Sequence, residues 1–321
     1  MIRLGIIGLN EGNGHPFSYA ALFNGYDPDA LQTRCPFALI REYLPRDHRN
    51  ENFIAGAKVT HVWTQDRDLS RDVASVALIP NVVDRLEDLA GKVDAVILAR
   101  DDPWNHLGMA EPFLRCGIPI FIDKQLTATA ADLDALLALA GPDYPLMAGS
   151  AMRFTRDLAQ TRESRRCSEV RSIHGMSRVS WMRYGHHLFE GIAAIWGTDI
   201  LWARSLSAAA GHDIVQLRYR TGPNVILEFI ETVQLPIQFT CFSDVEAAFS
   251  VPFHDFFHSF REMLKAFVFL VQTGAKAISY EEMVSIAKVI IAGDISKRSG
   301  GTLISPRTLS PVSEDAARAC Q

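Results

Sequence analysis

The sequence lacks a long apolar run: stretches such as Ala266–Val271 fall far short of the roughly 20 residues that a membrane-spanning helix needs. The apolar residues Leu4–Leu9 near the N-terminus are too few for the core of a signal peptide. The chain also lacks a dense block of Lys and Arg, and its formal net charge is −5. Such a charge argues against binding of a phosphate backbone as the main role. We therefore expect neither a membrane nor a nucleic acid as a partner.

Cysteine is scarce and scattered. The 5 cysteines are odd in number and widely spaced, and none forms a C-x-x-C pair. This pattern predicts neither a disulfide framework nor a zinc ribbon, and it is typical of a protein kept in the reducing cytoplasm. His254 and His258 stand at helical spacing, but no third ligand has an obvious spacing to them. We therefore predict no metal site.

The length of 321 residues suggests two domains, at about 150 residues each. The first half alternates apolar β-rich runs with helix-like segments, which predicts βαβ units and a mostly parallel sheet. After Gly149 the pattern changes to short strands separated by turns, followed by two helices. We predict an α/β protein with an N-terminal domain at 1–150 and a C-terminal α+β domain at 151–321, built on an open, mostly antiparallel sheet. The predicted strands are Ile2–Ile7, Val59–Thr64, Val93–Ala99, Ile118–Ile122, Leu146–Gly149, Val170–Trp181, Ile214–Tyr219, Val225–Ile230 and Ile237–Phe242, and the predicted helices are Phe17–Phe23, Trp104–Cys116, Ala130–Ala140, Phe256–Thr273 and Tyr280–Ala292.

An irregular stretch separates the first predicted helix from the second strand. Residues 25–57 include Pro28, Pro36 and Pro45, and they do not fit a simple βαβ connection. We interpret this stretch as an insertion that carries a loop or an extra helix.

A glycine-rich turn lies between the first strand and the first helix. Glycines in this context let the backbone approach a pyrophosphate, and the N-terminus of the helix presents free N–H groups to it. The G-x-G-x-x-G spacing is not met, because asparagines stand where the second and third glycines belong. Asparagine tolerates left-handed backbone, so a substitute turn remains open; a glycine-rich loop without a ligand is the alternative. The candidate cofactor-binding residues of this turn are Gly8, Asn10, Gly12, Asn13, Gly14 and His15.

The polar end of the second strand is the expected site of ribose recognition. An acidic residue here hydrogen-bonds the ribose hydroxyls and repels a 2′-phosphate, and Asp66 is our candidate. Arg67 and Arg71 are close enough in sequence to accept that phosphate instead, so NADP stays open beside NAD. The structural alternative is a helix start with Asp68 or Ser70 as its N-cap.

Several segments together resemble the glucose–fructose oxidoreductase / inositol dehydrogenase family (Gfo/Idh/MocA). Asp123-Lys124-Gln125 stands where that family has Glu-Lys-Pro, and His106 precedes it at the start of a helix. Met152-Arg153-Phe154 is similar to the family's entry into its C-terminal domain, and 185–190 is similar to its G-x-H-x-x-D segment. The resemblance spans most of the chain and leaves the insertion outside.

The resemblance implies a Rossmann domain, an open sheet that carries the substrate site, and assembly into a homodimer or homotetramer through that sheet. It implies hydride transfer between a nicotinamide and a carbinol of a sugar, amino sugar or cyclitol, with nucleotide-linked and anionic substrates included. Lys124 would hold the reacting hydroxyl and His187 would take its proton, which requires a base with a pKa near the working pH. The remaining expected cofactor contacts are Arg100, Asp101, His106 and Asp123, and the expected substrate contacts are Arg153, Arg183 and Tyr184.

Two departures from the family's pattern bear on the chemistry. Arg183 occupies a position that is often acidic in the family, and Gln125 replaces a proline. An added arginine favours an anionic substrate group, or it marks a member whose catalysis is altered or lost. Two alternatives therefore stay open: an epimerase or glycoside-cleaving enzyme with no net redox change, and a catalytically silent regulator that binds a sugar or dinucleotide. The charges of Arg100, Asp101 and Asp102 either contact ligand or pair with one another.

Overall fold

The structure is a computed structural model that describes residues 1–47, 53–164, 167, 169–206, 209–245 and 248–309. The chain forms two compact units, and we describe each by itself. The first unit comprises Met1–Leu126, Ala135–Ala148 and Phe256–Ile278; the second comprises Thr127–Asp134, Gly149–Asp255 and Ser279–Gln321. In chain order the elements are β1 (Ile2–Ile7), α1 (His15–Asn24), α2 (Pro28–Arg34), α3 (Ala38–Asp47), β2 (Ala57–Trp63), α4 (Arg67–Val76), β3 (Asn81–Val82), η2 (Leu86–Leu89), β4 (Ala95–Leu98), α5 (His106–Arg115), β5 (Ile120–Asp123), α6 (Ala130–Leu139), β6 (Leu146–Gly149), η3 (Ala151–Phe154), α7 (Arg156–Glu163), β7 (Val170–Ser177), α8 (Trp181–Trp196), β8 (Ile200–Ser205), β9 (His212–Tyr219), β10 (Asn224–Ile230), β11 (Gln238–Ser243), β12 (Phe249–Pro252), α9 (Phe256–Thr273), α10 (Tyr280–Arg298) and η5 (Pro306–Thr308).

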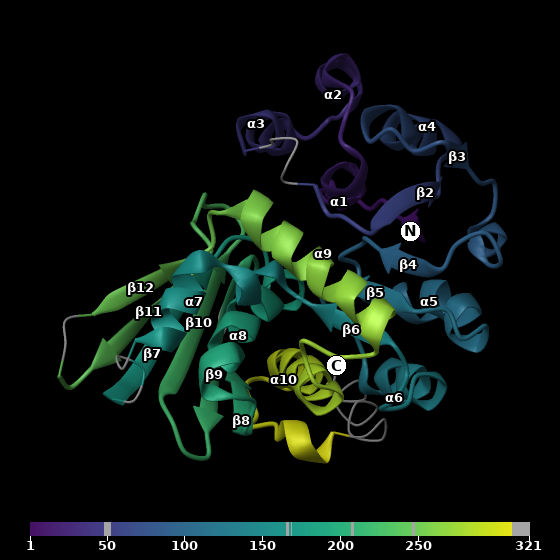
Figure 1. Cartoon of the computed structure of the whole chain (residues 1–321). Coiled ribbons are helices and arrows are strands. Elements are labelled where there is room, and N and C mark those ends of the chain that lie inside the picture. The colour runs from purple at the N-terminus through teal and green to yellow at the C-terminus, as the bar shows by residue number, and fades with distance from the viewer. Residues whose placement is uncertain (48–52, 165–166, 168, 207–208, 246–247, 310–321) are drawn as a thin grey trace. The chain divides into compact units, whose positions relative to one another are not determined.

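The first unit is built on a six-stranded sheet in the order β3-β2-β1-β4-β5-β6 (Figure 1). The pairs β1–β2, β1–β4, β2–β3 and β4–β5 are parallel, as the alternating pattern predicted. Strand order reverses direction between β1 and β4, and open parallel sheets bind ligands at the carboxyl ends of their strands at such a point. The fold thereby places the loops after β1, β4 and β5 at one edge.

Helix α9 belongs to the first unit, although it follows most of the second unit in the sequence. It contacts α1, and the ring of Phe260 lies 5.2 Å from that of Tyr19. The ring of Phe267 lies 5.9 Å from that of Phe121 on β5. The two compact units thus differ from a division at residue 150, because α9 returns to cover the parallel sheet.

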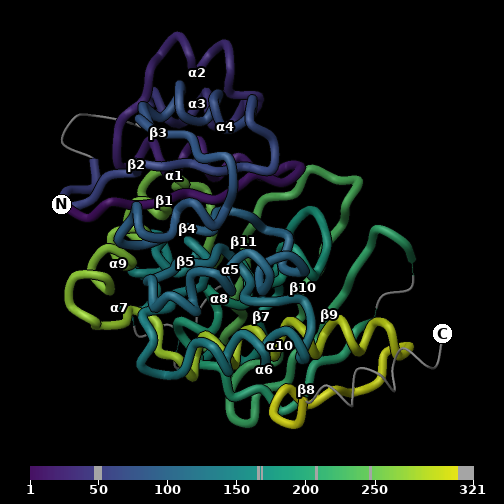
Figure 2. Tube along the Cα trace, turned by 90° about the vertical axis from the view of Figure 1, so that its right-hand side faces the viewer, coloured from purple at the N-terminus to yellow at the C-terminus, as the bar shows by residue number. Residues whose placement is uncertain are grey.

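The insertion at 25–57 forms two helices, α2 and α3, within its described residues; 48–52 lie outside them. Helix α2 contacts α4, and Figure 2 shows the two helices next to each other. The Asp27 side chain caps α2 by accepting a hydrogen bond from the Ala30 N–H at 2.7 Å. Side chains of Phe37 and Ile40 fill the space beside Gly14, where a Cβ would come within 2.5 Å of Ile40. The insertion therefore supports the glycine-rich turn by packing against it.

The second unit is built on a mixed six-stranded sheet in the order β12-β11-β7-β10-β9-β8. The β10–β7 pair is parallel, whereas β9–β10, β8–β9, β7–β11 and β11–β12 are antiparallel, which confirms the prediction of an open, mostly antiparallel sheet. Helices α8 and α10 pack on one face. Along β9, buried side chains alternate with partly exposed ones. The side chains of the opposite face therefore remain accessible within this unit.

The prediction that one strand runs from Val170 to Trp181 is wrong at its end, because β7 stops at Ser177 and Trp181 begins α8. The reason is tertiary: the carboxylate of Asp213 on β9 accepts a hydrogen bond from the Trp181 N–H at 2.9 Å. The indole of Trp181 is buried and donates to the Ile290 carbonyl at 2.8 Å. A Cβ at Gly185 would come within 2.5 Å of that indole, so the glycine gives the ring its space.

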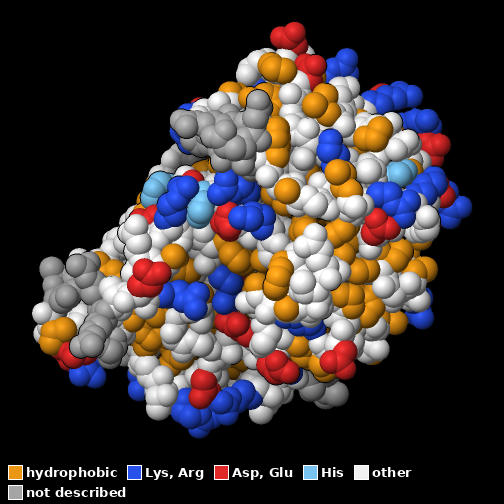
Figure 3. Space-filling model, viewed as in Figure 1, with side chains coloured by type: hydrophobic (Ala, Val, Ile, Leu, Met, Phe, Trp, Pro, Cys, Tyr) orange, Lys and Arg blue, Asp and Glu red, His pale blue; other side chains and the backbone are white. Residues whose placement is uncertain are grey.

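Among the described residues, no helix is both long enough and apolar enough to span a bilayer. On the face shown in Figure 3, basic and acidic side chains are interspersed.

Candidate functional site

The loop after β1 forms a tight turn ahead of α1. Asn10 and Asn13 make an isolated β-bridge, with the Asn13 N–H donating to the Asn10 carbonyl at 3.0 Å. Gly12 has a φ of 77°, a left-handed conformation that glycine adopts without strain. A Cβ at Gly8 would collide with the ring of Pro16, so this glycine permits the close approach of β1 and α1.

The side chain of Asn13 lies at the N-terminus of α1. Its Oδ1 accepts a hydrogen bond from the His15 N–H at 2.8 Å. Its Nδ2 is buried and has no hydrogen-bond partner among the described residues. A buried amide donor without a partner is unfavourable by about 1–3 kcal/mol, so this position suits an anionic group such as a pyrophosphate.

The loop after β4 reaches across to the loop after β1. Arg100 donates two hydrogen bonds to Asp102, at 2.8 and 2.5 Å, and one to the Leu9 carbonyl at 2.7 Å. Asn10 Nδ2 donates to Asp101 Oδ1 at 2.5 Å, and the Asp101 N–H donates back to Asn10 Oδ1 at 3.1 Å. The sequence left open whether Arg100, Asp101 and Asp102 contact a ligand or pair with one another. In the structure Arg100 pairs with Asp102, whereas Asp101 binds other residues. These contacts join the two loops at the point where strand order reverses.

Lys124 follows β5 and is 3% exposed. Its Nζ lies 3.7 Å from a carboxylate oxygen of Asp101 and 3.7 Å from one of Asp123. Two buried carboxylates next to one ammonium stabilise its charged form. The structure therefore presents a buried cation at the carboxyl edge of the parallel sheet, and the Lys124–Gln125 peptide bond after it is cis.

Asp123 joins this cluster to α1. Its carboxylate lies 2.6 Å from Nδ1 of His15 and accepts a longer hydrogen bond, 3.4 Å, from the Tyr19 hydroxyl. Burial by itself raises the pKa of Asp123, but the charges of Lys124 and His15 outweigh it and hold the pKa below its ordinary value. Asp123 therefore stays ionised and fixes the ring of His15, which stacks on Tyr19 at 4.5 Å.

His106 does not cap its helix through its side chain. It is fully buried, and its Nδ1 lies 2.6 Å from the Gln125 carbonyl while its Nε2 lies 3.2 Å from the Arg100 carbonyl. Burial lowers the pKa of His106 despite these carbonyls. The neutral ring has one N–H and donates to only one of these carbonyls, and its shorter contact is with the Gln125 carbonyl, so it packs the loop after β4 against the residue after Lys124. The carboxamide of Gln125 is buried beside it, and neither of its polar atoms has a partner among the described residues.

Asp66 is the N-cap of α4: its Oδ1 accepts hydrogen bonds from the N–H groups of Asp68 and Leu69, at 2.7 and 3.2 Å. The alternative of a helix start is thus correct, but the cap is Asp66 rather than Asp68 or Ser70. Arg67 pairs with Asp84, and Arg71 pairs with Asp68 at 2.7 Å. The carboxylate of Asp66 keeps its Oδ2 outside the capping bonds.

In the second unit, His187 lies on α8 and is 5% exposed. Its Nδ1 is 2.6 Å from the hydroxyl oxygen of Ser150. The ring of Tyr184 meets it edge-on at 5.1 Å, and the ring of Phe253 lies 5.6 Å away. A histidine held by one hydroxyl between two aromatic rings has a fixed orientation, which a catalytic imidazole requires.

Arg153, an expected substrate contact, has two carboxylate partners within the second unit. Its Nε donates to Glu190 Oε1 at 2.5 Å and its Nη2 donates to Glu282 Oε1 at 2.6 Å. Glu190 also lies 3.0 Å from Nε2 of His186, one turn earlier on α8. Burial raises the pKa of Glu190, but Arg153 and His186 outweigh burial and hold the pKa below its ordinary value. This cluster braces η3, α8 and α10.

Within the first unit, the structure brings together the candidates Asn10, Asp101, Asp123, Lys124 and His15. Within the second, it brings Tyr184 to His187. Asp66, Arg67 and Arg153 have partners within the protein, and their ligand roles stay predictions. Sequence reasoning missed Ser150, whose only signal was its place directly after a predicted strand.

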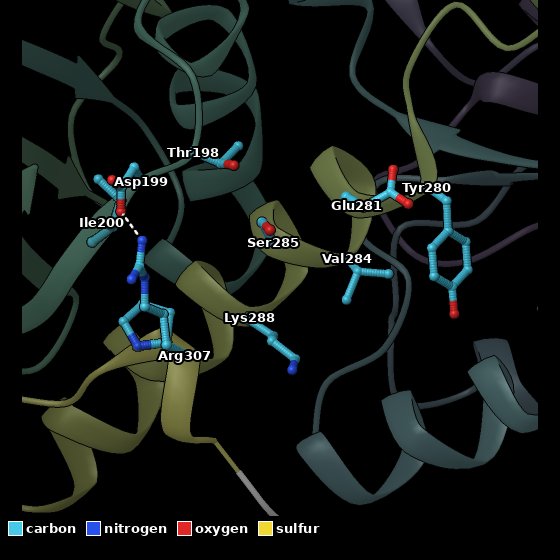
Figure 4. Close-up of a pocket in the computed structure, with 10 residues that line it drawn as sticks. Thr198, Asp199, Ile200, Tyr280, Glu281, Val284, Ser285, Lys288 and Arg307 are labelled. Atoms are coloured by element: carbon cyan, nitrogen blue, oxygen red, sulfur yellow. Dashed lines mark hydrogen bonds and ion pairs between the residues drawn. The ribbon is translucent and has the colours of Figure 1, made fainter. Parts of the chain in front are cut away.

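A separate cavity of about 560 Å³ opens in the second unit, between the start of β8, α10 and η5. Figure 4 shows Glu281 and Lys288 on α10 and the ion pair of Asp199 with Arg307. The residues that line this cavity include none of the candidates from the sequence.

The fold is that of the Gfo/Idh/MocA proteins, so the resemblance is confirmed at the level of the fold. The structure is similar to that of myo-inositol 2-dehydrogenase from Lactobacillus plantarum, with 14% identity, a TM-score of 0.71, and coverage of 95% of this chain and 99% of that one. Myo-inositol dehydrogenase from Lactobacillus casei, solved with NAD(H) and myo-inositol, gives 13% identity, a TM-score of 0.69, and coverage of 98% and 99%. Scyllo-inositol dehydrogenase from Lactobacillus casei, solved with NAD(H) and scyllo-inositol, gives 12% identity and a TM-score of 0.68, with coverage of 96% of this chain and 99% of that one. No family model matches the sequence. No curated protein matches it either.

Proposed function

We propose that this protein is an NAD-dependent oxidoreductase that transfers hydride between the nicotinamide and a carbinol of a sugar, amino sugar or cyclitol. One observation carries the proposal: a lysine buried between two carboxylates follows β5, at the edge of a parallel sheet where such folds bind ligands. Two inositol dehydrogenases of the same fold were solved with NAD(H). The proposed location is the cytoplasm.

The residues of the first unit fit a dinucleotide. The Nδ2 of Asn13, which has no partner among the described residues, and the exposed residues Glu11 and Gly12 suit the pyrophosphate. The unpartnered carboxamide of Gln125 suits a polar group near Lys124, and Oδ2 of Asp66 suits a ribose hydroxyl. When bound, the nicotinamide would accept or supply the hydride.

We assign Lys124 and His187 to the reacting oxygen. The Lys124 ammonium stabilises negative charge on that oxygen, and the pair exchanges the proton that accompanies hydride transfer. The resemblance alone assigns this proton to His187; which member of the pair exchanges it depends on which nitrogen of the neutral imidazole carries the ring proton. Arg183 and Tyr184, on the same helix, are the proposed substrate contacts, with Arg183 suited to a carboxylate or phosphate.

We further propose a homodimer or homotetramer through the second sheet. Apolar side chains, including Met176 at 37% and Phe242 at 41% exposure, lie on its strands, and a sheet face of this kind is normally covered. Sedimentation equilibrium of the full chain tests this state, and a monomer at micromolar concentration contradicts it.

The direct test is turnover. Cyclitols and sugars, including nucleotide-linked sugars, are tested as substrates with NAD and with NADP. Turnover is measured as the change in nicotinamide absorbance. Lys124→Met is expected to lower kcat by at least 100-fold, in the range of lost acid–base and electrostatic catalysis. Lys92→Met removes an exposed lysine of the same unit and is expected to leave kcat unchanged. Near-full activity of Lys124→Met and His187→Ala would show the assigned roles to be wrong.

A second candidate is a catalytically silent binder of a sugar or dinucleotide. It is favoured by Arg183 and Gln125, which depart from the pattern of the family that the sequence resembles. Thermal stabilisation by NAD without turnover on any substrate would support this candidate. Turnover without a change in nicotinamide absorbance would instead support an epimerase or a glycoside-cleaving enzyme.

A further inference from the structure

The hydroxyl of Ser150 holds His187 from the segment directly after β6. Ser150 is 1% exposed and caps η3, because its Oγ accepts a hydrogen bond from the Met152 N–H at 3.1 Å. The same Oγ lies 2.6 Å from Nδ1 of His187. Met152 and His187 are the partners of this oxygen among the described residues.

Counting protons settles the direction of the second hydrogen bond. A serine hydroxyl has one proton to donate, and its oxygen accepts from Met152. If Nδ1 of His187 carried a proton, it would donate to Oγ, and the buried Ser150 hydroxyl proton would have no acceptor in the described part of the chain. That arrangement is unfavourable by about 1–3 kcal/mol. The hydroxyl therefore donates to Nδ1, and the proton of the neutral imidazole is on Nε2.

The surroundings of His187 within its unit hold the ring without deciding its proton. Two aromatic rings, Tyr184 and Phe253, pack against it. Arg183 stands four residues before it on α8 and Glu190 three residues after it, so charges of both signs lie on this side of the helix. The assignment of the tautomer therefore rests on the hydrogen bond with Ser150.

We propose that Ser150 is a positioning residue that holds neutral His187 with its proton on Nε2, so that His187 meets the reacting oxygen as a hydrogen-bond donor and Lys124 exchanges the proton. This inference rests on the proposed function for its catalytic part. In the direction of reduction, a bound nicotinamide would supply the hydride, its own C–H bond breaking as the new C–H bond forms. The C=O π pair would move to oxygen, and an N–H bond of Lys124 would break as the O–H bond forms. Lys124 then regains its proton from solvent.

Nitrogen-15 NMR of the full chain labelled in histidine tests the tautomer directly. The His187 signals are identified by their loss in His187→Gln. At neutral pH, we expect Nδ1 to resonate as an unprotonated nitrogen and Nε2 as a protonated one. A protonated Nδ1 would overturn the proposal. The result does not depend on turnover, so it stands even if the proposed oxidoreductase activity fails.

Two variants of Ser150 test its role. Ser150→Ala removes the hydroxyl and is expected to produce a mixture of tautomers and to lower kcat about tenfold, the effect of one hydrogen bond lost in the transition state. Ser150→Thr keeps a hydroxyl and is expected to restore the Nε2–H signature and most of kcat. Thr155→Ala is the matched control: it removes another buried capping hydroxyl, on α7, that has no bond to His187. If Thr155→Ala changes the His187 signals as Ser150→Ala does, the effect is structural and the proposal is wrong.

Discussion

The ion pair between Arg153 and Glu190 is nearly removed from water. Their side chains are 9% and 1% exposed, and Nε lies 2.5 Å from Oε1. The second oxygen of Glu190 lies 3.0 Å from His186, so both oxygens have partners. Arg153 also binds Glu282, whose side chain is 25% exposed. One carboxylate therefore compensates the charge of a buried guanidinium and orients a histidine.

Glu190→Gln keeps the shape of this side chain and removes its charge. Arg153 is left with the partly solvated Glu282 alone, and His186 loses its carboxylate partner. Breaking a buried pair by removing one member costs about 3–5 kcal/mol, because the remaining charge is buried without compensation. At about 2–4 °C per kcal/mol for a domain of this size, the melting temperature of the second unit falls by about 6–20 °C.

Differential scanning calorimetry of the full chain measures this change. The matched control is Arg171→Ala, which breaks an ion pair with Asp244 whose side chains are 73% and 57% exposed. Exposed pairs contribute about 0–1 kcal/mol, so this control is expected to shift the melting temperature little. The double variant Arg153→Met/Glu190→Leu is expected to recover most of the loss, because apolar residues replace a buried pair well. A loss below about 1 kcal/mol in Glu190→Gln would refute the reasoning, since it would mean that water reaches this pair.

Three further predictions follow from particular contacts. Since the pKa of Glu190 is held below its ordinary value, its stabilisation is present at neutral pH and is lost as the pH falls through the folded-state pKa, so acid unfolding curves should be flatter in Glu190→Gln than in the wild type. Gly185→Ala should lower the free energy of unfolding by about 1–3 kcal/mol in a urea titration, because its Cβ would meet Trp181 at 2.5 Å. Gly108→Ala on α5, where the Cβ meets open space, is the control and should leave this free energy unchanged or raise it. Asn13→Asp should weaken NAD binding at least tenfold in calorimetric titration, because it replaces a buried donor by a carboxylate; unchanged affinity would place the pyrophosphate elsewhere.

Local pattern was sufficient for the elements that are strongly apolar and clearly bounded. The run Ile2–Ile7 ends at Gly8 in both prediction and structure, and the helix Phe256–Thr273 has its predicted bounds. Lys124 follows a buried strand, as its position after an apolar run indicated. These features depend on residues that are neighbours in the sequence, so the sequence contains their signal.

Partners of polar side chains were not predictable in the same way. The sequence predicted Asp66 as a ribose ligand but not as the cap of α4, and it predicted Arg153 as a substrate contact but not as the partner of Glu190 and Glu282. On a helix, His187 and Glu190 share a face, yet the bond of Glu190 goes to His186. Which partner each of these side chains binds depends on the residues that the fold brings close to it and on the rotamer that packs best there.

The sequence by itself determined that the chain forms a parallel α/β sheet followed by an open, mostly antiparallel sheet, because the spacing of apolar residues and glycines is a local property. Only the tertiary structure decided which charged groups are compensated and which polar atoms keep no partner. Whether the buried amides of Asn13 and Gln125 and the hydroxyl of Ser150 have hydrogen-bond partners depends on residues that are far away in sequence and close in space. A buried polar atom is favourable or costly according to its neighbours in space, and the sequence does not specify those neighbours until the chain has folded.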